Sequence, residues 1–279
     1  LLDARADSLE SLAADKLDAP LRDAFLERME GRAQLSRHWK PYQRGDAAGA
    51  YLWEREMPFN GTQSQRIVFE SGSGEFGIDN AGLNRWGIQL VEGKPYEGLL
   101  RVRSAAPCTV QVSLLDAEGA RTLAETALAV AGGPAYQCLE FTLTPSASDP
   151  KGRFAIALKE HGEITVGYAF LQPGPWGRFK GLPLRKELVE SVIHQGVKVM
   201  RYNGSMVNRC PQGDLYKWKE MIGPRDLRQP YRGWFNAYAS HGFGIIDFLN
   251  LCEAAGFLAV PGFRIDETPE DMIDFVEYV

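Results

Sequence analysis

The chain has 279 residues, of which 44% are hydrophobic and 24% are charged, and its formal net charge at pH 7 is −5. This composition is ordinary for a globular protein, and the length exceeds what one hydrophobic core usually organises, which predicts two domains. The negative charge disfavours a nucleic-acid partner. No apolar run approaches the roughly 20 residues of a membrane-spanning helix, so we expect no membrane partner either.

Residues 1–35 form a predicted helical segment, in which Leu1–Gly31 show the helical pattern, with Asp18-Ala19-Pro20 as a helix start and an apolar stripe of Leu9, Leu12, Leu17, Leu21, Phe25 and Met29. The segment carries no chemical motif, so we expect a packing or linker helix. Because the chain opens on Leu1 without a methionine and stops inside a helical pattern, we expect a fragment of a longer protein. The compartment is left open, with an extracytoplasmic one slightly favoured.

Residues 36–174 are rich in short β-type runs that are separated by turn residues. The predicted strands are Ser64–Glu70, Arg85–Gln89, Tyr96–Arg103, Thr109–Leu115, Thr122–Val130, Gln137–Leu143, Phe154–Leu158 and Ile164–Leu171. Apolar and polar residues alternate clearly in Val110-Gln111-Val112-Ser113-Leu114 and in Leu139-Glu140-Phe141-Thr142-Leu143, which is typical of strands buried on one face. Eight strands at this spacing, with no helix between them, predict an antiparallel β-sandwich of the jelly-roll type.

Residues 175–279 change to a helix, strand, helix, strand, helix pattern, which predicts β/α units around a parallel sheet. The predicted strands are Val197–Tyr202 and Phe257–Pro261. Thr268 followed by Pro269 is a strong start for the last helix. Since two strands cannot close a sheet, we expect this part to open a larger β/α barrel whose remainder is missing. The fold class is therefore multidomain, β plus α/β.

The first site candidate is Arg201, which follows the apolar run Val197, Val199, Met200 and precedes the Asn203-Gly204 loop. A charged residue at the carboxyl end of a buried strand is costly unless it has a partner. In β/α architectures, binding residues gather at that end. A site role and a simple strand-end position remain open alternatives on these grounds.

The cysteines and acidic turns give no metal or cofactor prediction. Cys108, Cys138, Cys210 and Cys252 lack zinc-ligand spacing, and two free buried thiols are favoured over a bond between Cys108 and Cys138. Asp79-Asn80, and Asp116 near Glu118, are candidates for a structural calcium ion. Solvated turn residues are the favoured interpretation.

A chain of spaced motifs resembles glycoside hydrolase family 51, which includes the α-L-arabinofuranosidases. The motifs are Arg201-Tyr202-Asn203-Gly204, Tyr216-Lys217-Trp218, Ile222-Gly223-Pro224-Arg225, Arg228-Gln229-Pro230, Gly242-Phe243-Gly244 with Asp247-Phe248, Asp266-Glu267-Thr268-Pro269-Glu270, and Phe275-Val276-Glu277-Tyr278. The preceding sandwich resembles a carbohydrate-binding module of the family 4/9 type. The family's proline and second glycine are Asn203 and Ser205 here, and Met206 replaces the asparagine that follows, which indicates a divergent branch.

The resemblance implies a retaining double displacement on a β/α barrel, acting on arabinofuranoside-containing or related plant polysaccharide. One carboxylic acid protonates the leaving oxygen, and a carboxylate roughly 5 Å away attacks the anomeric carbon. In the family both glutamates lie on later strands, and the acid/base follows an asparagine. No Asn-Glu pair occurs in this chain, so we expect no catalytic residue within it. Asp266 and Glu267 are better explained as the entry to a helix.

The resemblance also implies substrate-binding residues. Arg201 matches the family's active-site arginine, Trp234 falls near a tryptophan that packs on the substrate, and His241 stands about where the family has asparagine. Core packing is as good an explanation for Trp234 and the nearby Tyr231, and helix capping for His241. We expect Tyr216 and Trp218 to brace the loop.

Two other functions remain open. The chain could be a stand-alone carbohydrate-binding protein, with a sugar platform drawn from Trp53, Trp86, Tyr96 and Tyr136, although most aromatic residues of a sandwich belong to its core. Alternatively, it is an interaction module without any role toward sugars. The sequence leaves the sugar, the linkage and the oligomeric state open.

Overall fold

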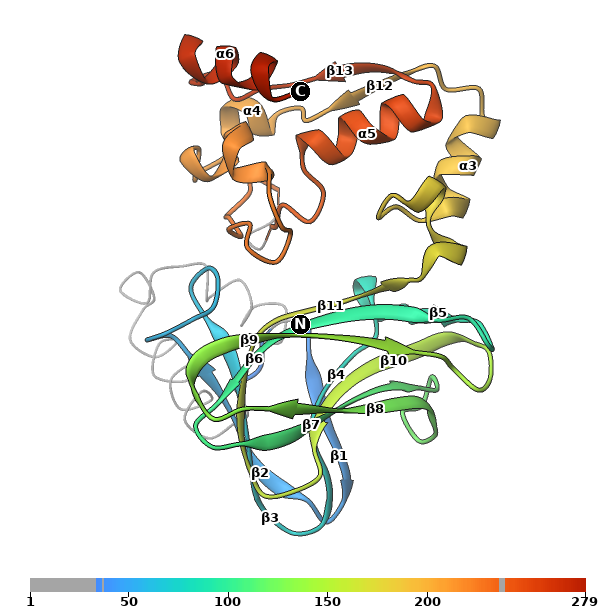
Figure 1. Cartoon of the computed structure of the whole chain (residues 1–279), viewed down its shortest axis with the longest axis vertical. Coiled ribbons are helices and arrows are strands. Elements are labelled where there is room, and N and C mark those ends of the chain that lie inside the picture. The colour runs from blue at the N-terminus through green and yellow to red at the C-terminus, as the bar shows by residue number, and fades with distance from the viewer. Residues whose placement is uncertain (1–33, 37, 236–238) are drawn as a thin grey trace, which may run out of the picture. The chain divides into compact units, whose positions relative to one another are not determined.

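The computed structural model describes residues 34–36, 38–235 and 239–279, so the helix expected over residues 1–31 lies outside the described residues. The chain divides into two compact units (Figure 1). Unit 1 is Leu1–Gln172 and unit 2 is Pro173–Val279. Each is described by itself below.

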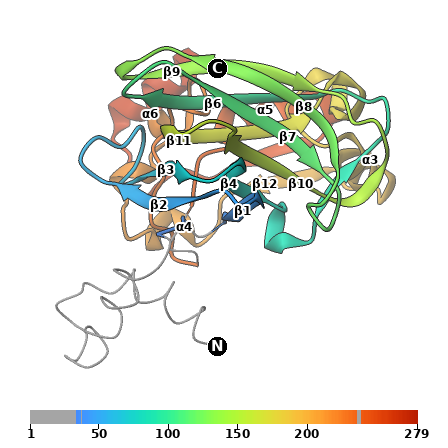
Figure 2. The same ribbon diagram turned by 90° about the horizontal axis from the view of Figure 1, so that it is seen from below.

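Unit 1 is a sandwich of two antiparallel sheets (Figure 2). One sheet has the strand order β1-β4-β10-β7-β8, with β5 paired to β10, and the other has the order β2-β3-β11-β6-β9. The strands are β1 Lys40–Gly45, β2 Ala48–Glu54, β3 Ser64–Ser71, β4 Gly74–Asn80, β5 Ile88–Leu90, β6 Tyr96–Ser104, β7 Cys108–Leu115, β8 Thr122–Val130, β9 Gly133–Leu143, β10 Asp149–Leu158 and β11 Gly162–Pro173. The predicted antiparallel sandwich is confirmed.

The core of unit 1 follows from period-two alternation along its strands. In β6, Tyr96, Gly98, Leu100 and Val102 are buried while the residues that alternate with them are half-exposed. Across the sandwich, the rings of Tyr51 and Phe76 stack with centroids 4.6 Å apart. Each fully buried large apolar side chain contributes roughly 1.5–3 kcal/mol relative to exposure, so these inward rows hold the two sheets together.

The strand predictions for unit 1 need two corrections. Arg85–Gln89 is not one strand: Leu83–Arg85 forms a 3₁₀ turn (η2), Asn84 and Arg85 have positive φ angles, and β5 begins only at Ile88. Strands β1, β2 and β4 were not predicted.

Strand β4 was missed because its sequence, GEFGIDN, mixes glycines and acids, which are rare in strands. The buried Glu75 side chain accepts a hydrogen bond from the hydroxyl of Tyr42. The buried Asp79 carboxylate pairs with Arg85 at 3.1 Å and with Arg153 at 3.2 Å. These partners offset the cost of burying two acids in a strand.

Unit 2 contains a two-stranded parallel sheet with helices. Strands β12 (Val199–Tyr202) and β13 (Leu258–Pro261) pair with Val199 opposite Leu258 and Tyr202 opposite Pro261. The helices are α3 Lys186–His194, α4 Met206–Arg209, α5 Ile245–Ala255 and α6 Pro269–Tyr278, with 3₁₀ turns η3 Pro175–Gly177, η4 Phe179–Gly181, η5 Asp214–Tyr216 and η6 Trp218–Met221. The predicted parallel β/α pattern is confirmed. No helix among the described residues is long and apolar enough to cross a membrane.

The helix boundaries of unit 2 follow local signals. Gly256 ends α5 in the left-handed conformation with φ 74°, a conformation that glycine adopts without strain. Thr268 begins α6 with a capping box, in which its hydroxyl accepts from the Asp271 amide and the Asp271 carboxylate accepts from the Thr268 amide.

One face of the β12/β13 sheet is covered and the other is open. Helix α5 supplies Phe248 and Cys252, which pack with Met200, Tyr202 and Ala259 on the covered face. The opposite face presents Val199, Leu258 and Val260, which are 53%, 66% and 42% exposed. The expectation of a fully buried strand over Val197–Tyr202 is therefore wrong, because only alternate residues face a helix.

The cysteine prediction is corrected in one respect. Cys108 and Cys138 are free, as expected, but Cys138 is exposed and Cys108 is half-buried. They lie on β7 and β9, which belong to different sheets.

Candidate functional site

Arg201 lies on β12, one residue before its carboxyl end, and its side chain is exposed. By strand alternation it shares the open face with Val199 and, across the register, with Val260. Its Nη2 atom lies 3.5 Å from the position that a Cβ at Gly204 would take, so the guanidinium reaches back over the following loop. The expected burial of this charge is wrong, and the guanidinium is accessible to a ligand.

Asn203 ties together three segments at this strand end. Its Nδ2 donates to the Gly262 carbonyl at 2.6 Å, and its Oδ1 accepts from the Tyr216 hydroxyl. Its φ angle of 68° lies in the left-handed region, which asparagine tolerates and proline cannot adopt. The proline that the related motif carries at this place would therefore require a different backbone here. Sequence reasoning recognised the departure at Asn203 but not this role.

Tyr216, Tyr231 and His241 form one aromatic cluster. The rings of Tyr231 and His241 stack at 4.4 Å, and those of Tyr216 and Tyr231 are 5.2 Å apart. His241 is 2% exposed, and its Nε2 lies 2.6 Å from the Leu215 carbonyl oxygen. Burial raises the pKa of Tyr231 to about 12. His241 thus braces the loop, and its predicted contact with a substrate stays a prediction.

The loop before α5 is anchored by a buried ion-pair network. Asp247 accepts from Arg228 at 2.7 Å, from Arg225 at 3.2 Å and from the amide of Gly244 at 2.8 Å. Arg228 also donates to the carbonyl oxygens of Gly223 and His241. Burial alone would raise the pKa of Asp247, but these hydrogen bonds and charges outweigh it and hold the pKa below its ordinary value.

Trp218 connects this loop to the region around α6. Its backbone amide donates to Glu267 Oε1 at 2.8 Å, and its indole Nε1 donates to the Asp271 carbonyl at 2.9 Å. The indole is buried and meets the Phe275 ring edge-on at 5.3 Å. Burial raises the pKa of Glu267. These contacts are those of a bracing residue. They give Glu267 a structural role as the acceptor for the Trp218 amide.

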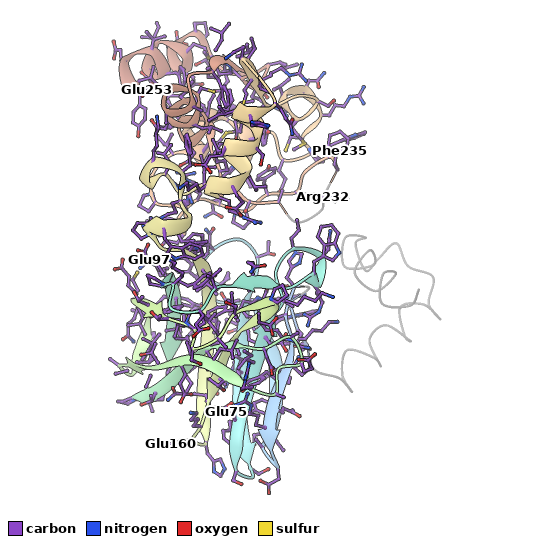
Figure 3. All side chains as sticks on the ribbon, turned by 90° about the vertical axis from the view of Figure 1, so that its right-hand side faces the viewer. Glu75, Glu97, Glu160, Arg232, Phe235 and Glu253 are labelled. Carbon is purple, nitrogen blue, oxygen red and sulfur yellow. The ribbon has the colours of Figure 1, made fainter. Side chains whose placement is uncertain are left out.

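Trp234 lies in the loop that follows the 3₁₀ turns, and it is 54% exposed. Its amide lies 3.4 Å from the Met206 sulfur, and the Arg209 guanidinium lies 5.7 Å from its ring centroid. The neighbouring Phe235 is also exposed, as is Arg232 (Figure 3). An exposed indole suits stacking on a sugar, which stays a prediction for Trp234.

The aromatic residues that the sequence suggested as a sugar platform on the sandwich do not all lie on its surface. Trp86 is exposed whereas Tyr96 is buried, with its hydroxyl donating to the Gln89 carbonyl. Among the residues that the structure describes, no group of three or more His, Cys, Asp or Glu side chains is placed to hold a metal ion. Asp79 is not a solvated turn residue, because its carboxylate is buried between two arginines.

The buried His241 makes the stability of unit 2 depend on pH. Burial, followed by the nearby Arg228 charge, lowers the pKa of His241 despite the hydrogen bond to Leu215. The unfolded chain, in which the histidine pKa is about 6.5, therefore binds the proton more readily. We expect the free energy of unfolding to fall as the pH drops below about 6.5 and through the lower folded pKa. Urea titrations between pH 5 and 8 measure this slope.

The control for the pH experiment is a histidine on the surface. His241→Gln is expected to flatten the slope, whereas His194→Gln, which removes an exposed histidine of α3, is expected to leave it unchanged. If the pH dependence of the unfolding free energy is unchanged in His241→Gln, its assignment to His241 is wrong.

Comparisons with known proteins agree with this architecture. Residues 194–279 match the family described as the alpha-L-arabinofuranosidase 1 domain. The chain is 28% identical over 189 residues to alpha-L-arabinofuranosidase 1 of Arabidopsis thaliana, a match that covers 66% of this chain and 27% of the relative. It is 29% identical over 212 residues to an extracellular exo-alpha-L-arabinofuranosidase of Streptomyces chartreusis, covering 71% of this chain and 25% of that protein.

The solved structure of arabinose-bound MgGH51 α-L-arabinofuranosidase matches 88% of this chain and 44% of its own chain, with a TM-score of 0.71 and 20% identity. At that identity, the match establishes the fold. This chain is thus related to the glycoside hydrolases. More narrowly, it is related to the amino-terminal region of the family 51 α-L-arabinofuranosidases, which confirms the resemblance found in the sequence. It spans about a quarter of the length of the curated relatives that it matches.

Proposed function

We propose that this chain forms the amino-terminal part of a retaining glycoside hydrolase that acts on arabinofuranoside-containing or related plant polysaccharide. In this proposal the sandwich is a jelly roll and unit 2 opens a (β/α) barrel. The observation that carries it is the position of Arg201, exposed near the carboxyl end of a parallel strand. In barrel enzymes the active site is built at that end of the strands.

The open face of the β12/β13 sheet supports the barrel. Val199, Leu258 and Val260 form an apolar surface on the side away from α5. In a barrel this side faces the interior, where side chains from further strands fill the space. The match over only a quarter of each curated relative agrees with further strands supplied outside this chain.

The chemistry assigns a limited role to the residues of this chain. A guanidinium donates several fixed hydrogen bonds to sugar hydroxyls or to a neighbouring carboxylate, which suits Arg201 to orient the sugar or the nucleophile. A retaining mechanism needs two carboxyl groups about 5 Å apart. Near the end of β13, Glu267 accepts from the Trp218 amide and Asp266 pairs with Arg264 at 2.9 Å. We infer that strands outside this chain supply the catalytic pair.

The test measures release of nitrophenol from nitrophenyl α-L-arabinofuranoside. The 279-residue chain is expected to give no release above the blank, because it lacks the carboxylate pair. A chain extended through the remaining strands is expected to cleave the substrate. In that longer chain Arg201→Ala is expected to lower kcat/KM by about 10²–10³-fold, the usual cost of removing a donor that stabilises the transition state.

Arg201→Lys is the matched variant, since it keeps the charge but removes the planar fork, and it is expected to recover only part of the loss. Cleavage by the 279-residue chain that disappears in Arg201→Ala would place the catalytic pair within this chain and refute the proposal.

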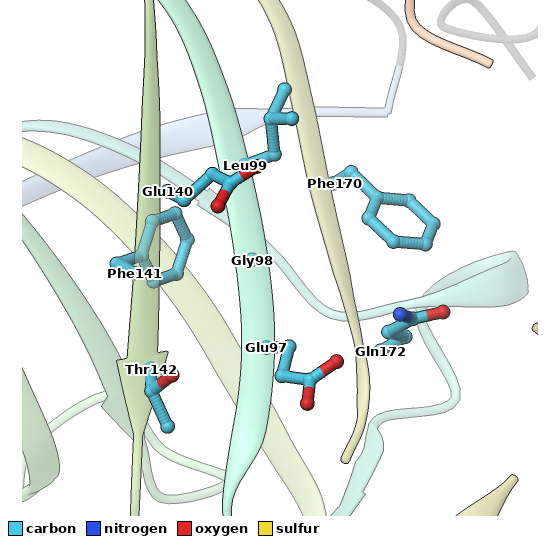
Figure 4. A pocket seen from close by; sticks show the side chains of 8 residues that line it. All are labelled: Glu97, Gly98, Leu99, Glu140, Phe141, Thr142, Phe170 and Gln172. Carbon is cyan, nitrogen blue, oxygen red and sulfur yellow. The ribbon is translucent and has the colours of Figure 1, made fainter. Parts of the chain in front are cut away.

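Carbohydrate binding without catalysis is the second candidate function. A groove of about 620 Å³ on unit 1 favours it, and its lining includes Gly98, Leu99, Phe141 and Phe170 (Figure 4). This function predicts affinity for polysaccharide that persists when residues 178–279 are deleted, whereas the hydrolase proposal places the essential contacts in unit 2.

A further inference from the structure

Arg209 and Arg232 are exposed arginines of unit 2 to which the hydrolase proposal gives no role. Among the residues that the structure describes, no acid forms an ion pair with either guanidinium, and neither guanidinium donates a hydrogen bond. The arginines of unit 2 that do pair with an acid are Arg185, Arg225, Arg228 and Arg264. The N–H groups of Arg209 and Arg232 are therefore available to a ligand.

Backbone contacts hold Arg232 beside the segment that carries Arg209. The Arg232 amide donates to Gln212 Oε1 at 2.6 Å. Its carbonyl oxygen lies 3.5 Å from the sulfur of Cys210, the residue that follows Arg209. The position of Arg232 is thus fixed before any ligand arrives, and preorganisation of this kind lowers the entropic cost of binding.

Trp234 links the two arginines from the other side. It follows Arg232 by two residues, and its amide lies 3.4 Å from the sulfur of Met206, the first residue of α4. The guanidinium of Arg209, the last residue of the same helix, lies 5.7 Å from the centre of the Trp234 ring, a cation–π distance. A guanidinium that lies over a ring uses its flat face, so the N–H groups at its edge can still bind a carboxylate.

The charge of this surface is opposite in sign to that of the whole chain. The chain carries a net charge of −5, which repels anions at long range. Arg264, which donates to the Cys210 carbonyl oxygen, is neutralised by Asp266 at 2.9 Å. The positive charge without a countercharge next to it therefore comes from Arg209 and Arg232. Planar guanidinium groups match carboxylates through pairs of parallel hydrogen bonds.

We propose that Arg209 and Arg232 form a subsite for the carboxylate of a uronic acid, with Trp234 holding the Arg209 guanidinium in place. The inference rests on the proposed function, since it assigns an acidic neighbour of the cleaved sugar to the loop that follows Arg201. It narrows the substrate class to arabinofuranoside-containing polysaccharides that also carry uronic acids.

The test is isothermal titration calorimetry of the full 279-residue chain at pH 7 with two trisaccharides. Trigalacturonate is expected to bind, and neutral arabinotriose is expected to bind at least about tenfold more weakly, because it lacks the charged acceptor. Arg209→Gln and Arg232→Gln are each expected to weaken trigalacturonate binding by about tenfold, through loss of charge-assisted hydrogen bonds. Arg209→Lys is expected to recover only part of that loss, since lysine keeps the charge without the planar fork. Circular dichroism checks that each variant is folded.

Arg185→Gln is the matched control, because it removes the charge of an exposed arginine that already pairs with Glu187. It is expected to leave trigalacturonate binding unchanged. Inorganic sulfate at the same concentration of charge is expected not to displace trigalacturonate, which separates a site for an acidic sugar from a general anion site.

Absence of trigalacturonate binding overturns the proposal, as does equal binding of arabinotriose. Displacement by sulfate overturns the assignment to an acidic sugar, and an equal loss in Arg185→Gln overturns the assignment to Arg209 and Arg232. The nitrophenyl substrate carries no carboxylate and is assayed in the extended chain. Failure of this subsite is therefore distinguishable from failure of the hydrolase proposal.

Discussion

Asp247→Ala is expected to lower the free energy of unfolding by about 3–5 kcal/mol, the usual cost of breaking a buried ion pair from one side. The Asp247 carboxylate is the common acceptor for Arg228, Arg225 and the Gly244 amide. The Arg228 side chain is only 7% exposed, so the substitution takes the Asp247 charge away from a buried guanidinium. Urea denaturation followed by tryptophan fluorescence measures the change.

The matched control is Asp274→Ala, which removes an exposed acid of α6 that pairs with Lys219. Ion pairs in solvent contribute about 0–1 kcal/mol, so this variant is expected to lose at most that amount. Equal losses in the two variants would mean that the burial of Arg228 does not determine the cost.

Asp247 also makes the stability of the fold sensitive to acid. Because the folded pKa of Asp247 lies below its unfolded value near 3.9, the stabilisation it provides is complete above that value. It is lost as the pH falls through the folded pKa, which separates it from the His241 effect at higher pH.

Trp218→Ala is expected to cost about 3–5 kcal/mol, the range for truncating a large buried aromatic side chain. The substitution removes the contact with Phe275, opens a cavity and leaves the Asp271 carbonyl without its indole donor. Trp234→Ala removes the same side-chain type from an exposed position and is expected to cost less than about 1 kcal/mol. Thermal and urea unfolding of both variants provide the comparison. Similar losses would contradict the bracing role of Trp218.

Much of the fold could be predicted because burial imposes a simple period on the sequence. The alternation of Val110-Gln111-Val112-Ser113-Leu114 lies within β7, and Thr122–Val130 was predicted with the bounds that β8 has, since turn residues flank it on both sides. Gly74–Asn80 was not predicted, because its buried acids are stabilised by Arg85, Arg153 and Tyr42, which are distant in the sequence or outside the strand. No local pattern encodes partners of that kind.

The candidate site likewise contains residues that the sequence could predict and residues that it could not. Arg201 was found because a charge at the end of an apolar run stands out along the chain, although alternation exposes it instead of burying it. The burial of His241 depends on Tyr231 and Leu215, and the groove of unit 1 depends on the pairing of Gly98 with Phe141 across two strands. Both depend on contacts between residues that are apart in the sequence, which no local pattern displays.

The two-stranded sheet of unit 2 has a consequence for handling the protein. Within the part of the chain that the structure describes, β12 and β13 pair only with each other, so each presents an outer edge of amide and carbonyl groups. Such an edge is a template onto which any extended peptide can add as a new strand. The exposed apolar side chains of Val199, Leu258 and Val260 lie beside this edge, so an added strand would gain hydrophobic contacts as well as backbone hydrogen bonds. In a barrel, these edges would pair with the neighbouring strands. When such strands are absent, the edges would pair with strands from other copies of the chain.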